Sequence, residues 1–482
     1  MIAPSHLTER LRQVVGPEHV LAGAAAEEFS HDATFMRHGL AAVVRPATTG
    51  EVAEIVRTCY ADGTAVVARG GGTSLVGGPV PLAGGVVLSL DRLDSVTIDA
   101  PNLAAVAGAG AITAAIDEAA GAHGLMYPPD PASVEMCSIG GNVACNSGGM
   151  RCVKYGVTAD YVTGLTVVLA DGRVLRLGGK LRKRASGYRL MQLFVGSEGT
   201  LGVVTEVILK LVPLPRHRAV AMVGFATLEA AAAAVSRMLA EGHLPAAVEI
   251  MDRPSVDLVR HLLPPGFATE LEAVLVVEQD GGDAAHVQQG LMDLVEVLDG
   301  IDNRIAQSSV ERERLWAARR SFGKVLMAMP HHNFAEDVAV PIGLIPEMVR
   351  RVHRIGADTG LRICIVGHAG DGNLHPAIVF EEHQRPLVSS AAAAIFEAAL
   401  DLGGTISAEH GLGALKRDYA EVEHGPLALG LMRDLKRLLD PTGILNPHKV
   451  FPEKPADADF LNRMDGWLPI AGSAARRQET GL

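Results

Sequence analysis

Two short stretches in the second half of the chain carry side chains suited to metal binding and acid–base chemistry. The first, RICIVGHAGDGNLHPAIVF, spans residues 362–380 and holds His368 and His375. Its β-prone flanks enclose a GDGN turn, which predicts strand, turn and strand. Cross-strand neighbours lie about 5 Å apart at Cα, so both imidazoles can reach one cation at about 2.1 Å. A histidine pair that is only hydrogen-bonded is the alternative.

The second stretch, GGTISAEHGLGALK, spans residues 403–416 and places Glu409 beside His410, between an expected strand and a glycine turn. Neighbours on extended chain point to opposite sides, so Glu409 can complete a His/His/Glu set while His410 faces another target. Three protein ligands leave a coordination position open, as a catalytic metal site requires. Such a set suits zinc, manganese or iron.

Glycine is the unusual feature of the composition, with 53 among 482 residues against an average of about 7%. Seventeen of these glycines lie between Gly63 and Gly156, without a collagen-like period. There RGGGTSLVGG, residues 69–78, follows an expected strand, and its bare backbone N–H groups can converge on an anion. We therefore expect a phosphate or pyrophosphate. The spacing matches neither GxGxxG with its acidic partner nor GxxxxGK[ST], which excludes the nicotinamide and P-loop interpretations.

Two further strings of small residues have the same character. Residues 128–156 read PPDPASVEMCSIGGNVACNSGGMRCVKYG, a length of loop that is usually functional in a compact domain. Residues 196–206 read GSEGTLGVVTE and lead into an expected strand. Each string taken alone is equally compatible with a tight turn, but three in one domain favour a ligand cradle.

Together these strings resemble the FAD-linked D-2-hydroxy-acid dehydrogenases within the vanillyl-alcohol-oxidase/p-cresol-methylhydroxylase (PCMH) flavoproteins, over about residues 35–452. That branch includes cytochrome-type D-lactate dehydrogenase, the glycolate oxidase flavin subunit and D-2-hydroxyglutarate dehydrogenase. The phosphate loop has no histidine where covalently flavinylated relatives carry one, so the resemblance implies noncovalent FAD. The residues it assigns to FAD are Arg69, Gly70, Gly71, Gly72, Thr73, Ser74, Gly78, Pro129, Asp130, Ser133, Gly140, Gly141, Asn142, Ser147, Gly148, Gly149, Tyr155, Gly156, Glu198, Gly199, Gly202, Val204 and Asn446.

The same resemblance implies a divalent metal on His368, His375 and Glu409, and a catalytic base at His410. A metal chelated by a 2-hydroxy acid lowers the pKa of the hydroxyl, and a neutral histidine can take that proton as hydride passes to the flavin. The family pattern also places a carboxylate-clamping arginine at Arg319 in LWAARRSFG, with Arg320 as a rival. In the closing motif DPTGILNPHKVF, His448 stands where the family has glycine.

The implied activity is oxidation of a D-2-hydroxy acid to the 2-oxo acid. Hydroxyglutarate-type relatives carry a basic residue near Glu336 and Asp337, and acidic residues here favour D-lactate or glycolate, with D-2-hydroxyglutarate left open. A quinone, a cytochrome, an electron-transfer flavoprotein or oxygen would accept the electrons. Two alternatives are a flavin subunit of a multi-subunit glycolate-oxidising complex and a flavin transferase like alkylglycerone-phosphate synthase.

Composition limits the partners. The net charge of −12 argues against nucleic acid or an anionic membrane surface. Five scattered cysteines without a Cys-x-x-Cys pair indicate neither a disulfide framework nor a thiolate zinc site, which favours the cytoplasm. We expect no export signal and no transmembrane segment, since the uncharged residues 70–90 include seven glycines and two prolines. A homodimer and peripheral attachment to the inner face of the membrane stay open.

The elements that must position these residues predict an α+β protein: a PCMH-type FAD-binding domain of two α/β subdomains, and an α+β cap domain whose antiparallel sheet covers the flavin. A β-α-β opening is expected over residues 40–70 and a hairpin over 161–177 with an Asp171-Gly172 turn. The expected divisions are an N-terminal helical segment (1–36), the FAD-binding domain (37–215), the cap with the metal site (216–440), a segment returning to the FAD domain (441–455) and a disordered tail (456–482).

Overall fold

The computed structural model describes residues 6–267 and 270–453, so the predicted tail lies outside the described residues. The described residues divide into two compact units. Unit 1 holds residues 6–148, 157–214 and 409–453, and unit 2 holds 149–156, 215–267 and 270–408. The chain thus returns to unit 1 at Glu409, well before the boundary expected near residue 440, and it lends the short segment 149–156 to unit 2.

Unit 1 begins with a small, mostly parallel sheet. Among the described residues its strand order is β1-β2-β4-β3, with β4 parallel to both β2 and β3. The strands are β1 (Val20–Leu21), β2 (Ala42–Val44), β3 (Val66–Arg69) and β4 (Val86–Ser89). Helix α2 (Thr49–Asp62) connects β2 to β3, as the expected β-α-β opening requires. Its first turn is capped by Thr48, whose hydroxyl accepts the Glu51 N–H at 3.1 Å.

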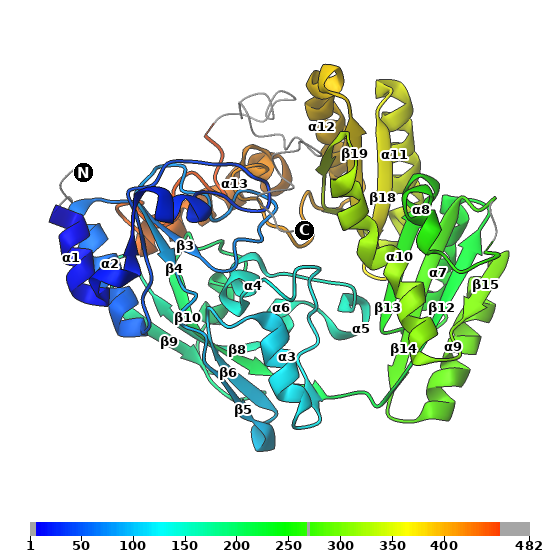
Figure 1. Ribbon diagram of the computed structural model, residues 1–482, viewed down its shortest axis with the longest axis horizontal. Coiled ribbons are helices and arrows are strands. Elements are labelled where there is room, and N and C mark those ends of the chain that lie inside the picture. Colours follow the sequence, from blue (N-terminus) through cyan, green and yellow to red (C-terminus); the bar gives the residue numbers. More distant parts are fainter. Residues whose placement is uncertain (1–5, 268–269, 454–482) are drawn as a thin grey trace. The chain divides into compact units, whose positions relative to one another are not determined.

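The second sheet of unit 1 is antiparallel, with the order β5-β6-β10-β8-β9 in the described part of the chain (Figure 1). The predicted hairpin is present as β8 and β9, and Gly172 takes the left-handed φ of 80° at its turn. The strands are β5 (Val96–Asp99), β6 (Ala104–Gly108), β8 (Val162–Val168), β9 (Val174–Gly178) and β10 (Val203–Lys210), with β7 (Leu125–Met126) and β11 (Val212–Pro213) paired separately. The helices are α1 (His6–Val15), α3 (Thr113–Gly121), α4 (Ile139–Cys145), α6 (Thr158–Tyr161) and α13 (Ala420–Leu439).

Unit 2 is built on one antiparallel sheet. Its order within the described residues is β15-β12-β14-β13-β18-β19-β16, with β17 also pairing to β19. The strands are β12 (His217–Phe225), β13 (Ala247–Asp252), β14 (Ala273–Gly281), β15 (Asp302–Ile305), β16 (His332–Ala335), β17 (Val338–Ala339), β18 (Arg362–His368) and β19 (Asn373–Phe380). The helices are α5 (Cys152–Tyr155), α7 (Leu228–Ala240), α8 (Arg253–Val259), α9 (Ala284–Leu298), α10 (Ser309–Ala328), α11 (Ile345–Thr359) and α12 (Arg385–Asp401).

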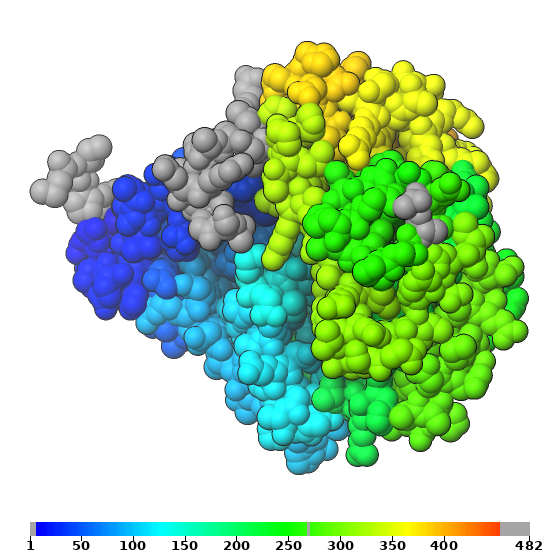
Figure 2. All heavy atoms as spheres, turned by 45° about the vertical axis from the view of Figure 1, so that its right-hand side comes forward, coloured from blue at the N-terminus to red at the C-terminus, as the bar shows by residue number. Residues whose placement is uncertain are grey.

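Helix α10 packs its apolar side chains on one face of this sheet. Trp316 and Phe322 belong to a buried cluster with inward residues of the central strands, among them Met251 and Val366. Helices α7, α9, α11 and α12 pack on the same strands, whose other buried side chains, such as Ile250, lie outside that cluster. Helices α11 and α12 lie side by side in both views (Figures 1 and 2). The sheet is therefore covered on both faces.

Two further findings concern the expected elements. The stretch before Glu409 is not a full strand, because only Thr405 forms an isolated bridge, to Ala339 in the two-residue strand β17. Across the described parts of the chain, the search for a helix both long and apolar enough to cross a bilayer found none.

Candidate active site

The two predicted histidines lie on the hairpin of β18 and β19. The register pairs His368 with Asn373 and Val366 with His375, which puts both histidines on the face that carries Val366. Their ring centroids are 5.2 Å apart and the planes are nearly perpendicular. The alternation of the strands thus places the imidazoles at the polar end of the face whose apolar end packs against α10.

A buried glutamate lies beside this pair. Glu249 on β13 is the direct cross-strand partner of His368, and its side chain has no exposed surface. Its Oε1 lies 2.5 Å from Nδ1 of His368, and its Oε2 accepts a hydrogen bond from Nε of Arg319 at 2.6 Å. One carboxylate therefore joins the predicted substrate arginine to a predicted metal ligand. No sequence motif pointed to Glu249, although a charged residue at an inward strand position of AVEIMD is the signal that could have found it.

The structure separates the two rival arginines on α10. The side chain of Arg319 is 13% exposed and lies on the inward face, between Trp316 and Phe322 in the helical repeat. The side chain of Arg320 is 47% exposed and pairs with Glu313 at 2.8 Å. Only Arg319 is thus held at the polar end of the sheet by a buried partner.

Asp337 brings the segment before Glu409 to the same end of unit 2. Its Oδ1 lies 3.8 Å from Nδ1 of His375. Its Oδ2 accepts hydrogen bonds from the Ser407 hydroxyl and the Ala408 N–H, both at 2.9 Å. Asp337 is fully buried, so this acidic position, expected from the sequence to tune substrate choice, also anchors a loop.

Glu409 and His410 open the last stretch of unit 1. Glu409 follows Ala408 directly, so its backbone is one peptide from a residue that Asp337 holds. Within this stretch Oε1 of Glu409 lies 3.6 Å from Nε2 of His410, and both side chains are largely buried. The two residues therefore form a local acid–imidazole pair.

The first glycine loop of unit 1 presents bare backbone. Gly71 is exposed, and Gly72 and Thr73 are partly exposed. Within the described residues no hydrogen bond uses their backbone N–H groups. Nearby, the Ser74 hydroxyl accepts the N–H groups of Val76 and Gly78 at 3.3 and 3.2 Å and so shapes the turn. Accessible donors without partners fit a phosphate or pyrophosphate.

The first and second glycine loops pack against each other. A Cβ on Gly70 would lie 2.0 Å from Oγ of Ser138, and one on Gly71 would lie 2.1 Å from the carbonyl oxygen of Met136. Ser138 also caps α4 by accepting the Gly141 N–H. The absence of side chains at 70 and 71 is therefore required by this close approach.

Asn446 links the first and third loops. Its Nδ2 donates to the carbonyl oxygens of Gly78 at 3.1 Å and of Glu198 at 2.7 Å. Its own N–H donates to the carbonyl of Val66 in β3. His448, at a position where we expect glycine, adopts the left-handed φ of 66° that glycine normally provides.

Glu198, predicted to contact FAD, also binds the backbone of a distant segment of unit 1. Its two carboxylate oxygens accept the N–H groups of Leu412 and Gly413 at 2.8 Å, just beyond His410. Burial raises the pKa of Glu198 to about 7, against these two hydrogen bonds and the charge of Lys449. Burial likewise lowers the pKa of Lys449 to about 8. The third glycine loop thus holds the backbone of the segment that carries His410.

The side chains of several predicted FAD contacts have partners within the protein. The guanidinium of Arg69 donates to the carbonyls of His31 and Glu28. The Tyr155 hydroxyl, in the segment lent to unit 2, lies 2.7 Å from Oδ2 of Asp280. Nδ2 of Asn142 donates to Thr113 at 2.8 Å. Gly149 and Gly156 fall in unit 2, and the remaining predicted residues, Pro129, Asp130, Ser133, Gly140, Ser147, Gly148, Gly199, Gly202 and Val204, fall in unit 1.

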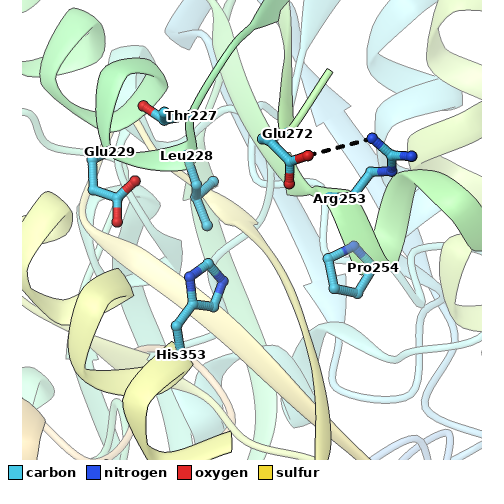
Figure 3. Close-up of a pocket in the computed structure, with 7 residues that line it drawn as sticks. All are labelled: Thr227, Leu228, Glu229, Arg253, Pro254, Glu272 and His353. Carbon is cyan, nitrogen blue, oxygen red and sulfur yellow. Dashed lines mark hydrogen bonds and ion pairs between the residues drawn. The ribbon is translucent and has the colours of Figure 1, made fainter. Parts of the chain in front are cut away.

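A small pocket in unit 2 contains none of the predicted residues. Its volume is about 190 Å³, below the range of about 300–1,000 Å³ typical of ligand sites. In Figure 3, Arg253 pairs with Glu272 at 3.4 Å on one side, while Glu229 and His353 come from α7 and α11. A hydrogen bond to Asp252 raises the pKa of His353. Acidic and basic groups thus compensate one another here, and we do not assign the hydroxy acid to this pocket.

Comparison with known proteins decides the family. A model of an FAD binding domain matches residues 40–178, and a model of the C-terminal domain of FAD linked oxidases matches residues 214–450. The glycolate oxidase subunit GlcD of Bacillus subtilis (strain 168) is 41% identical over 453 residues, which cover 92% of this chain and 96% of the relative. This chain belongs to the FAD-linked oxidase family.

Two further similarities extend this result. The D-lactate dehydrogenase of Archaeoglobus fulgidus is 37% identical to this FAD-linked oxidase over 410 residues, covering 85% of the chain and 90% of the relative. The structure of p-cresol methylhydroxylase with substrate bound superposes with a TM-score of 0.75 at 16% identity, covering 92% of this chain and 96% of the other. The predictions of an α+β protein with a PCMH-type FAD-binding domain, and of an FAD-linked oxidoreductase, are confirmed.

Proposed function

We propose that this FAD-linked oxidase oxidises a short D-2-hydroxy acid, glycolate or D-lactate in preference to D-2-hydroxyglutarate, to the 2-oxo acid. The observation that carries the proposal is the buried network of Arg319, Glu249 and His368 beside His375. It brings an arginine that can bind a carboxylate and two imidazoles that can bind a cation to one face of one sheet. Relatives named glycolate oxidase subunit and D-lactate dehydrogenase support this substrate class.

Both groups that the reaction needs fit the residues present. The N–H groups of Gly71, Gly72 and Thr73, which have no partner in the described part of the chain, suit the pyrophosphate of FAD. His368, His375 and Glu409 are ligand types that hold zinc, manganese or iron. When bound, FAD supplies the hydride acceptor, and the divalent cation supplies a Lewis acid that lowers the pKa of the substrate hydroxyl.

The side chains divide the remaining work. Arg319 binds the substrate carboxylate through guanidinium N–H groups that Glu249 does not occupy. His410 accepts the hydroxyl proton on an imidazole nitrogen. The substrate loses a hydride from C2 and a proton from its hydroxyl group. The C–O single bond thereby becomes the C=O bond of the 2-oxo acid.

Substrate length is assigned from the acidic pair Glu336 and Asp337. Both residues are buried, and Asp337 accepts hydrogen bonds from its own unit. A second substrate carboxylate near these groups would meet like charge in a poorly solvated place. We therefore favour monocarboxylate substrates.

We also propose that FAD is bound noncovalently, because the phosphate loop has no histidine to which the flavin could be attached.

The electrons would pass to a carrier such as a quinone, a cytochrome or an electron-transfer flavoprotein. The relative from Bacillus subtilis is named as a subunit, which favours a second candidate: the flavin subunit of a multi-subunit glycolate-oxidising complex. We also propose that the protein acts in the cytoplasm or at the inner face of the cell membrane. It would act there alone or as a homodimer.

Anaerobic mixing of the FAD-loaded protein with a panel of D- and L-2-hydroxy acids tests the activity. We expect the flavin absorbance to bleach with glycolate or D-lactate and the 2-oxo acid to form in equal amount. A yellow protein that none of these acids bleaches would refute hydroxy-acid oxidation and leave a non-redox flavin transferase as the alternative.

A further inference from the structure

We propose that Glu249 is a positioning residue that fixes, with one carboxylate, both the tautomer of His368 and the orientation of Arg319. The inference rests on the proposed function, because it assigns His368 to a cation and Arg319 to the substrate. It adds a residue that neither role includes, since Glu249 itself is expected to touch neither cation nor substrate.

The geometry gives Glu249 no freedom to act elsewhere. Its backbone pairs directly with His368 across β13 and β18, and its side chain is fully buried. Oε1 meets Nδ1 of His368 at 2.5 Å, and Oε2 meets Nε of Arg319 at 2.6 Å. Each oxygen thus has its own partner, and the two partners come from different elements, β18 and α10.

Counting donors and acceptors shows what the carboxylate does. A guanidinium only donates hydrogen bonds, and an ionised carboxylate only accepts them. Nδ1 of a neutral His368 must therefore carry the proton and donate to Oε1. Nε2 is then left with its lone pair, which is the state needed to bind a cation. Carboxylates that fix metal-binding histidines in this way typically contribute about 10–100-fold to metal affinity.

The same count explains why the residue must be glutamate. Both neighbours donate, so both side-chain oxygens must accept. A glutamine offers one acceptor and one NH₂ donor. The charged Arg319 would take the single oxygen, because hydrogen bonds to charged groups are the stronger ones. The NH₂ would then face Nδ1 of His368 and move the imidazole proton to Nε2, where it blocks the cation.

A matched control lies in the adjacent strand. Glu278 on β14 is buried on the same face, and its Oε2 accepts the indole N–H of Trp316 at 2.9 Å. It has no hydrogen bond to either histidine among those described for unit 2. The variant E278Q therefore changes a buried glutamate of this sheet without changing the His368 tautomer.

The test measures the dissociation constants of Zn²⁺ and Mn²⁺ by equilibrium dialysis on the FAD-loaded full chain. We expect E249Q to weaken binding about 10–100-fold and E278Q to leave it unchanged. In the double variant E249Q/R319M no arginine competes for the glutamine oxygen. His368 can then donate to it again, so metal affinity should recover towards that of the wild type even though the substrate clamp is lost.

The recovery separates positioning from a general loss of structure. The double variant also removes the unpaired buried charge that could prevent E249Q from folding. Wild-type affinity in E249Q, affinity in the double variant no better than in E249Q, or no cation binding by the wild type would each overturn the inference. A wild type that binds the cation but reduces its flavin with no hydroxy acid would refute the proposed function alone, because the dialysis result is independent of turnover.

Discussion

The two units of this FAD-linked oxidase prepare for their ligands in opposite ways. Unit 1 uses backbone: Gly70 and Gly71 let two loops approach within distances that a Cβ would prevent, and neighbouring N–H groups have no hydrogen-bond partner among the described residues. Unit 2 uses side chains, because Arg319, His368 and His375 project from regular elements with one buried carboxylate between two of them. A dinucleotide is thus expected where side chains are absent, and a small acid where they converge.

A buried glutamate supports each arrangement. In unit 1, both carboxylate oxygens of Glu198 accept hydrogen bonds from backbone N–H groups, those of Leu412 and Gly413. In unit 2, both carboxylate oxygens of Glu249 bind side chains, those of Arg319 and His368. The difference teaches that a buried carboxylate can fix either a loop or a pair of functional groups, and only its partners show which.

The largest effect should follow removal of the proposed base. His410 lies in unit 1, but its proposed role uses its side chain, so it is an exception to the contrast between the two units. We expect His410→Ala to slow anaerobic flavin reduction about 10²–10⁴-fold while FAD stays bound. His286→Ala, at a side chain that is 93% exposed, is the control. Reduction at the wild-type rate in H410A would refute its role as base.

The next largest effect on the reaction should come from Arg319, the proposed substrate-binding arginine of unit 2. Arg319→Lys keeps a cation beside Glu249 but loses the planar fork that binds a carboxylate. We expect kcat/KM for the hydroxy acid to fall about 10–100-fold, measured by anaerobic reduction, with FAD content unchanged. Arg320→Lys, in the exposed rival, should have no effect. Equal losses in the two variants would show that α10 does not distinguish its two arginines.

A smaller effect should follow from filling the backbone approach in unit 1. In Gly71→Ala the new Cβ would meet the Met136 carbonyl at 2.1 Å. Moving the two loops apart costs about 1–3 kcal/mol, and about tenfold weaker FAD binding corresponds to the lower part of that range. Flavin fluorescence titration measures the loss. Gly121→Ala, where a Cβ has open space, should bind FAD normally.

The smallest effect on the reaction should come from Glu198, because its change with pH acts on stability. Burial raises its folded-state pKa from the ordinary 4.5 to about 7. As pH rises from 4.5 to 7, the unfolded chain releases this proton first, so the contribution to stability present at low pH is lost. Relative to Glu198→Gln, the wild type should lose about 1–3 kcal/mol of unfolding free energy between about pH 5 and pH 8. Chemical denaturation at both pH values measures the unfolding free energies. A difference between the two proteins that is the same at pH 5 and pH 8 would contradict this shift in the pKa of Glu198.

Local sequence patterns predicted the elements that carry most candidate residues. GDGN between β-prone flanks predicted the His368–His375 hairpin. The glycine runs predicted loops with accessible backbone N–H groups. Glu249 could not be predicted from a local pattern because its partner His368 is 119 residues away in the sequence. Only the pairing of β13 with β18 brings the two residues together.

Side-chain direction was also beyond the reach of sequence motifs. Arg69 and Tyr155 lie in the predicted FAD motifs, yet their polar atoms bind Glu28, His31 and Asp280. The choice between Arg319 and Arg320 depended on which of two neighbours faces the sheet. These outcomes are set by tertiary packing rather than by local propensity.

The division of labour between the units is tested most directly by measuring two constants in the same pair of variants. These are the FAD dissociation constant and the substrate concentration that half-saturates anaerobic flavin reduction. We predict that G71A raises only the first constant and that R319K raises only the second. If R319K released FAD, or if G71A raised the half-saturating concentration as much as the FAD dissociation constant, the separation of backbone and side-chain roles would be wrong.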